Sequence, residues 1–308
     1  MEFCACQGTL SNTGTPEKQR IAASGVKFIA VRMKADDGSF NQILASDTID
    51  EAYLQARIND EDESRRWYPI GEFRNQEDVR ADAVTETLTS GENILTQQGL
   101  RTYTGWLINY APLYIKALKS FKCFNFGVFI INDCGGLEGS ITKDGTALRP
   151  VRVNNNNWNP TYVKQTPTVS AKVQLAFEFS QLEVDEDLRV ISEDEITADL
   201  LEAEGLLPLA AAISNEALTG FDAALTVDYD IFVNSSKEVV PGWVITDFAL
   251  LNKTNNTSIA ITSVTESPEG TYTFVIPAQT SQDVLELTNV KTTGNKPGFG
   301  LKQEITLP

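Results

Sequence analysis

The chain has 308 residues, 42% of them hydrophobic, and a formal net charge of −17. This length and apolar fraction allow one large or two medium domains with a substantial core. The charge argues against a basic surface that binds duplex DNA, because such binding neutralises phosphates with Lys and Arg. The chain contains no histidine, the commonest general base and metal ligand, so we expect neither a triad hydrolase nor a zinc enzyme.

No apolar run reaches the about 20 residues that a membrane-spanning helix needs. The N-terminus also lacks the basic and apolar regions of a secretion signal. We therefore expect synthesis in the cytoplasm and no membrane contact. The spacing of the four cysteines (Cys4, Cys6, Cys123 and Cys134) does not match a zinc knuckle, which favours free thiols. A pairing of Cys123 with Cys134 across a hairpin stays open.

The first part of the chain predicts an arm, a strand and a short helix. Residues 1–25 form an extended arm, because Gly, Asn and Pro break any periodicity. This arm is either a frayed terminus or a segment that reaches a neighbouring subunit. Residues 26–33 have the β-branched and aromatic content of a strand. Residues 47–59 predict a short helix that begins at a cap on Asp47 or Thr48.

A strand and a long helix are expected next. Residues 79–89 alternate between a charged face and a face of small side chains, so this strand shows its charged face to water. Ser90 can cap a helix that runs to about Tyr110 and continues through a proline-interrupted turn to Lys119. One face of this helix 90–119 carries an aromatic stripe at helical spacing, which we expect in the core. The stripe consists of Tyr103, Trp106, Leu107, Tyr110 and Tyr114.

Two strands follow with different patterns. Residues 122–131 are apolar on both faces, and Gly127 within them indicates a bulge or a close approach of another segment. Residues 169–180 alternate cleanly between apolar and polar side chains. A long strand with an open edge can pair with another chain. Residues 192–204 predict a short acidic helix, and residues 211–224 a linker.

Short strand runs separated by turns fill residues 225–308. Several such runs in a segment of this length predict a small immunoglobulin-like β-sandwich. Together with residues 26–210, they give a mainly β fold with a packed helix, of the α+β class. The groups left for catalysis are carboxylates such as Glu183 and Asp185, which share one solvated loop. We therefore expect no catalytic residue, no metal site and no cofactor, and no enzyme activity.

Residues 77–207 resemble the tail tube proteins of bacteriophages, or closely related virion proteins. The resemblance rests on three runs and on the strand and acidic helix at 169–207. The runs are Ala83-Val-Thr-Glu-Thr-Leu-Thr-Ser-Gly-Glu-Asn93, Gln98-Gly-Leu-Arg-Thr-Tyr103 and Leu118-Lys-Ser-Phe-Lys-Cys-Phe-Asn-Phe-Gly127. In such tubes hexameric rings stack, and each subunit lends strands to an inner barrel with its helix outside. A C-terminal immunoglobulin-like domain is a frequent addition in phage structural proteins.

The resemblance implies a tail-tube subunit of the virion, with a tail-tube-like β-sandwich or barrel at residues 26–210. Its expected partners are copies of itself, the sheath of a contractile tail, the baseplate, the tail terminator, and phage DNA passing without specific binding. Another phage part (baseplate or capsid decoration) and a cell-surface adhesin module stay open as alternatives. The polar strand faces provide the candidate lumen-facing residues. These are Arg80, Asp82, Glu86, Lys172, Gln174 and Glu178.

Overall fold

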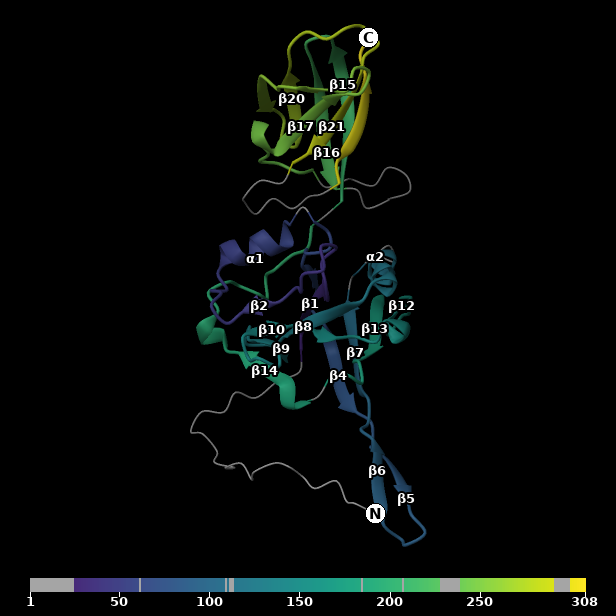
Figure 1. The fold of residues 1–308 in the computed structure, drawn as a ribbon. Coiled ribbons are helices and arrows are strands. Elements are labelled where there is room, and N and C mark those ends of the chain that lie inside the picture. The colour runs from purple at the N-terminus through teal and green to yellow at the C-terminus, as the bar shows by residue number, and fades with distance from the viewer. Residues whose placement is uncertain are drawn as a thin grey trace.

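The computed structural model describes residues 25–60, 62–108, 110, 114–183, 185–206, 208–227, 239–290 and 300–308. As expected from the sequence, the fold is mainly β with few helices (Figure 1). The arm expected at residues 1–25 lies outside the described residues, except for Gly25.

Two antiparallel sheets form the first part of the chain. The larger sheet contains β1 (Lys27–Arg32), β2 (Ile43–Leu44), β3 (Tyr68–Ile70), β8 (Phe126–Ile131), β9 (Leu137–Ile141), β10 (Ala147–Arg149), β11 (Val151–Arg152) and β14 (Leu188–Ile191). Its order is β2-β10-β9-β8-β1-β3, with β11 added to β8 and β14 to β9. The smaller sheet contains β4 (Arg74–Arg80), β7 (Arg101–Ile108), β12 (Asn159–Val163) and β13 (Lys172–Glu178). Its order is β12-β13-β7-β4.

The larger sheet is buried on both faces, because it lies between two cores. One face packs on the smaller sheet through an aromatic cluster that includes Phe28, Tyr103, Trp158 and Phe177. The Trp158 indole N–H donates to the carbonyl of Leu118 at 2.7 Å, which satisfies its buried polar group. The opposite face is covered by the helix α1 and by residues 196–203.

The short helix expected at residues 47–59 is confirmed as α1 (Glu51–Ile58). Its N-cap is Asp50, whose carboxylate accepts from the Tyr53 backbone N–H at 2.7 Å. Asp47, one of the two caps expected, instead accepts from the Leu44 N–H and the Tyr53 hydroxyl. Leu54 and Ile58 are buried against the larger sheet.

The prediction of a long helix at residues 90–119 is wrong. Within that range, β6 (Asn93–Gln97) and β7 are strands, and the described helix is α2 (Tyr114–Ser120). Ser90 caps no helix, because Gly91 has φ +85° in the turn that joins β6 to the preceding strand. The residues of the expected stripe therefore lie on two faces of β7. Tyr103 and Leu107 point into the core between the two sheets, and Trp106 points to the outward face.

Tyr110 and Tyr114, the last members of that stripe, lie beyond β7. Their rings pack together with centroids 4.7 Å apart, partly buried against the same core. The acidic helix expected at residues 192–204 is also wrong: only the 3₁₀ turn Glu193–Glu195 forms, and Ile196 then pairs with Ile49. The backbone N–H groups of Thr197 and Ala198 donate to the Ile49 carbonyl, so these residues pair with the body of the molecule instead of continuing a helix.

The C-terminal part is a sandwich of two four-stranded antiparallel sheets. Its strands are β15 (Leu209–Ala217), β16 (Gly220–Val227), β17 (Phe248–Asn252), β18 (Thr257–Ile259), β19 (Ser263–Glu266), β20 (Thr271–Val275), β21 (Val284–Asn289) and β22 (Lys302–Thr306). The sheet orders are β15-β16-β20-β19 and β18-β17-β21-β22. When β18 is taken as an additional strand C′ and the other strands are lettered from A in chain order, the first sheet has the A-B-E-D arrangement of an immunoglobulin fold.

The linker expected at residues 211–224 is wrong. These residues form most of the β15–β16 hairpin, whose side chains Phe221 and Ala223 are buried in the sandwich core. Four of the nine residues of β15 are alanine, so the sequence shows no clear alternation of large apolar and polar side chains there. The described core of the sandwich runs from Leu209 to Leu307 and shares no residue with the two cores of the first part.

Candidate assembly surface

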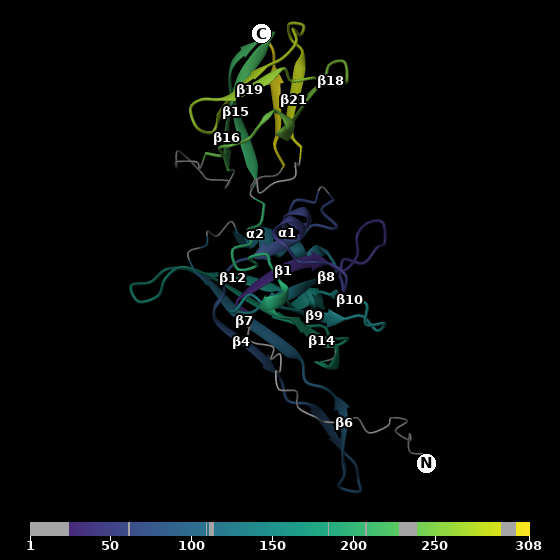
Figure 2. The same cartoon turned by 90° about the vertical axis from the view of Figure 1, so that its left-hand side faces the viewer.

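A two-stranded ribbon projects from the smaller sheet. It continues β4 and β7 into β5 (Val84–Thr87) and β6 (Asn93–Gln97), and it extends away from the body of the molecule in both views (Figures 1 and 2). We call residues 81–98 the distal ribbon. Every residue in it is exposed.

The distal ribbon carries large apolar side chains in open solvent. Val84, Leu88, Ile94 and Leu95 are between 38% and 56% exposed. Leu95 pairs with Thr85 and Ile94 with Glu86, so apolar groups stand on both faces of the ribbon. A two-stranded hairpin is at best marginally stable by itself in water. Such a ribbon with apolar groups on both faces is typical of a segment that a partner covers.

The outward face of the smaller sheet is polar. Lys172, Gln174 and Glu178 alternate along β13 with the buried Val173, Leu175 and Phe177, as the sequence predicted. Across the register, Gln174 faces Trp106 of β7, and the Lys172 ammonium lies over the Trp106 ring, 2.9 Å from its centroid. Thr102 and Thr104 of β7 extend this polar strip, and the exposed apolar side chains Val79 and Ile108 flank it on the same face.

The other three candidate lumen-facing residues do not share this face. Arg80 is two residues from Asp78, whose side chain points between the sheets, so it stands on the opposite side of β4 from Glu77 and Val79. Its guanidinium pairs with the carboxylate of Asp185. Asp82 follows the end of β4, and Glu86 lies in β5; both are exposed in the distal ribbon. One continuous surface therefore contains Lys172, Gln174 and Glu178 but not all six.

A buried ionic cluster joins the two sheets at the root of the ribbon. Arg101 of β7 donates to Asp78 of β4 at 2.6 Å and to Glu138 of β9 at 3.2 Å. The three side chains are only 17%, 14% and 4% exposed, and the Arg101 guanidinium also covers the Phe179 ring. The sequence patterns did not predict that these three charged side chains meet. Its signal was a single carboxylate, Glu138, in the otherwise uncharged segment Leu137–Ile141.

Burial raises the pKa of Glu138 above its ordinary value of 4.5, although the neighbouring Arg101 lowers it. A carboxyl whose pKa is raised on folding binds its proton more tightly in the folded state. Its contribution to stability is therefore full below the unfolded pKa of about 4.5 and is lost as the pH rises through the raised folded value.

We expect Glu138→Gln to gain stability relative to the unmodified protein as the pH rises from 4 to 7, because glutamine keeps a hydrogen-bond acceptor for Arg101 and has no proton to lose. Urea unfolding at several pH values measures this difference. Glu77→Gln removes the exposed carboxylate next to Asp78 in β4 and is the matched control. Parallel pH profiles for Glu138→Gln and the unmodified protein would contradict the expectation.

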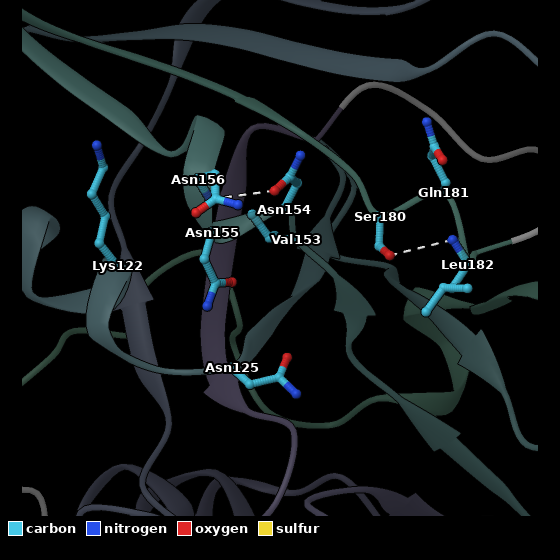
Figure 3. Close-up of a pocket in the computed structure, with 9 residues that line it drawn as sticks. All are labelled: Lys122, Asn125, Val153, Asn154, Asn155, Asn156, Ser180, Gln181 and Leu182. Carbon is cyan, nitrogen blue, oxygen red and sulfur yellow. Dashed lines mark hydrogen bonds between the residues drawn. The ribbon is translucent and has the colours of Figure 1, made fainter.

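A shallow polar depression of about 660 Å³ lies beside the loop that follows β11. Figure 3 shows its lining, in which Asn154 bonds to the Asn156 N–H and the Ser180 hydroxyl to the Leu182 N–H (Figure 3). Asn125, Gln181 and Lys122 also line it. The depression is open to solvent, so water can satisfy these groups, and nothing in its geometry selects a ligand.

Thiol and metal chemistry gain no geometric support in the described part of the chain. Cys123 and Cys134 are exposed and unpaired, so the pairing across a hairpin is not formed; Cys4 and Cys6 lie outside the described residues. Among the residues that the structure describes, no three Cys, Asp or Glu side chains gather in a metal-binding arrangement. No described helix has the length and apolar character needed to cross a bilayer.

Comparison with known proteins adds little. No family model matches the chain, and no curated protein matches it. Among solved structures, the N-terminal part of the bacterial S-layer protein SbsC is similar over 33% of this chain and 24% of its own length, with 16% identity and a TM-score of 0.25. A likeness this partial carries no argument about fold or function.

Proposed function

We propose that this chain is a structural virion protein, a subunit of a phage tail tube that stacks as hexameric rings around a lumen conducting DNA. The observation that carries the proposal is the distal ribbon, whose exposed apolar side chains lie on both faces. Each of these side chains is already about half buried in the subunit, so covering the rest stabilises association by about 1 kcal/mol each. A ring of copies can cover them, whereas an isolated subunit leaves them in water.

The polar face of the smaller sheet supports the same function. We infer that Lys172, Gln174 and Glu178 line the lumen, because water in a channel can solvate the polar side chains that alternate along this strand face. The net charge of −17 suits a channel for DNA, since negative surfaces repel phosphates and keep the polymer from binding the wall. In this proposal DNA passes without specific contacts, and no residue acts as a catalyst.

The C-terminal sandwich has its own core, so we infer that it stands on the tube as a separate unit. Other tail proteins then contact the ends or the outside of the tube: the baseplate, the tail terminator, and the sheath if the tail contracts. In this proposal the protein is part of the virion, after synthesis in the host cytoplasm.

Negative-stain microscopy of the purified full chain, together with light scattering over a concentration series, tests the proposal. We expect rings or tubes and a mass that increases with concentration. A monomer at every concentration, with neither rings nor tubes on the grid, would contradict self-assembly. In an assembled particle solved at side-chain resolution, Lys172, Gln174 and Glu178 should face the channel, and their appearance on the outer wall would contradict the lumen assignment.

A further inference from the structure

The charges of this chain are distributed unevenly along its sequence. Residues 93–132 and 145–177 contain eight Lys and Arg and no Asp or Glu, although the whole chain has a net charge of −17. Residues 183–204, in contrast, contain ten Asp and Glu and one arginine. The question that follows is where the fold places the exposed charges of these segments.

One flank of the body is basic. The helix α2 buries Leu118 and carries the exposed Lys119, and the exposed Lys122 follows in the 3₁₀ turn Phe121–Cys123. This helix packs beside β12, and the exposed Lys164 follows the end of that strand. In the described part of the chain the three ammonium groups form no ion pair. We call Lys119, Lys122 and Lys164 the basic flank.

The opposite flank of the body is acidic. The strand β14 lies between two 3₁₀ turns, Asp185–Asp187 and Glu193–Glu195, in which no side chain is buried. Glu186, Glu193 and Asp194 are exposed, and they form no ion pair within the residues that the structure describes. We call these three carboxylates the acidic flank. Figure 1 shows β14 on the side of the body away from α2 and β12 (Figure 1).

Flanks of opposite sign on opposite sides of one body suit a head-to-tail contact between copies. Such a contact joins two different surfaces of the same chain, and it generates a ring when the rotation between copies closes. Two chains of net charge −17 repel one another, and contact between like flanks would add to this repulsion. The basic flank of one copy against the acidic flank of the next is the arrangement in which these charges attract.

We propose that the basic flank docks on the acidic flank of a second copy of this chain, and that this contact orients the subunits side by side in a ring. The inference rests on the proposed self-assembly. Because exposed ion pairs are individually weak, the flanks act on the orientation and the rate of association more than on affinity. The apolar side chains of the distal ribbon then contribute the affinity.

Reversing the charge of one flank at a time tests the contact in the full chain. Lys119→Glu with Lys122→Glu leaves both flanks acidic. Glu193→Lys with Asp194→Lys leaves both flanks basic. We expect each variant alone to form rings at least ~10-fold more slowly than the unmodified protein, because like charges then meet. An equimolar mixture should recover ring formation, since the two variants can alternate around a ring.

Light scattering follows the rate, negative-stain microscopy shows the rings, and circular dichroism melts check that the exposed substitutions leave the fold intact. The matched controls place the same charge changes on exposed residues of the C-terminal sandwich. They are Lys253→Glu with Lys302→Glu, and Glu216→Lys with Glu269→Lys, and both should form rings at the unmodified rate. Ring formation at the unmodified rate by either flank variant, or a mixture as slow as its components, would overturn the proposal.

The mixture also separates this contact from the proposed tube. If the unmodified protein stays monomeric, the tube is contradicted, but sedimentation velocity of the mixed variants still measures whether the flanks attract. Association of the two variants, each monomeric alone, then supports the contact, and its absence contradicts it. Retention of the unmodified protein on immobilised DNA, lost in Lys119→Glu with Lys122→Glu, would instead assign the basic flank to nucleic acid.

Discussion

A protein with both Val84→Asp and Leu95→Asp should remain folded and lose self-association. The two side chains are 56% and 55% exposed, so the monomer loses almost no packing. In the assembly each carboxylate would be buried without a partner, and the apolar contact would be lost. About half of each side chain remains to be buried on association, so losing both apolar contacts costs about 1.5–3 kcal/mol in total. We therefore expect each docked ribbon to associate at least ~10-fold more weakly.

Sedimentation velocity and negative-stain microscopy measure the loss of assembly, and a thermal melt followed by circular dichroism checks the fold. Leu182→Asp is the matched control, because Leu182 is also an exposed apolar side chain, at 72%, but lies on the body. Normal rings from Val84→Asp with Leu95→Asp would show that the ribbon is not the contact. Equal damage from Leu182→Asp would point to a nonspecific effect of added charge.

The second large effect is expected at the root of the ribbon. Arg101→Met should lower the free energy of unfolding by about 3–5 kcal/mol, because it leaves two buried carboxylates without a counter-charge. Methionine keeps much of the volume over the Phe179 ring, so the loss reports mainly on charge. Combining Arg101→Met with Glu138→Gln should recover part of it, since one of the two uncompensated charges is then removed.

Chemical denaturation measures the stability of these variants. Arg74→Met is the matched control on the same sheet: Arg74 pairs with Glu72, and the side chains are 64% and 56% exposed. An exposed ion pair contributes at most about 1 kcal/mol. If the two methionine variants lose equal free energy of unfolding, the buried cluster around Arg101 contributes no more to stability than an exposed ion pair.

The sequence predicted the strands whose pattern has one clear meaning. Residues 172–178 alternate between large apolar and polar side chains, and only a half-buried strand has that period. Residues 126–131 are apolar throughout and bounded by turns, as in a strand covered on both faces. In the C-terminal segment the strand runs expected at 271–276, 284–290 and 301–307 are confirmed as β20, β21 and β22, because turns with Gly, Pro and Asn separate them, whereas β16 begins at Gly220 in the expected linker.

The prediction of a long helix was wrong because the apolar residues of one segment match both the helical and the strand period. Tyr103, Trp106, Leu107 and Tyr110 match a helical stripe, yet Tyr103, Gly105 and Leu107 also share one face of a strand. The threonines at 102 and 104 and Ile108 favour the strand, as β-branched residues do. The Ser90-Gly91 pair between β-branched runs was the available signal of a hairpin turn.

The candidate site could be predicted only in part. The outward face of β13 follows from alternation, which needs no tertiary information. Arg80 was expected on the face toward water because it is charged, whereas it stands on the same side of β4 as Asp78 and pairs with Asp185. The cluster of Asp78, Arg101 and Glu138 joins residues up to 60 positions apart in sequence, and such pairs leave no local pattern.

Gly127 also determines how the larger sheet is aligned. Along β8, Phe126, Val128 and Ile130 enter one core, and Phe129 and Ile131 enter the other. Because both cores are apolar, a slip of β8 by one residue against its neighbours β1 and β11 would exchange these sets without exposing any of them to water. A Cβ at Gly127 would lie 2.7 Å from the Val151 carbonyl oxygen. Such a slip would place Phe126 or Val128 there, so this one missing side chain selects a single alignment among apolar alternatives.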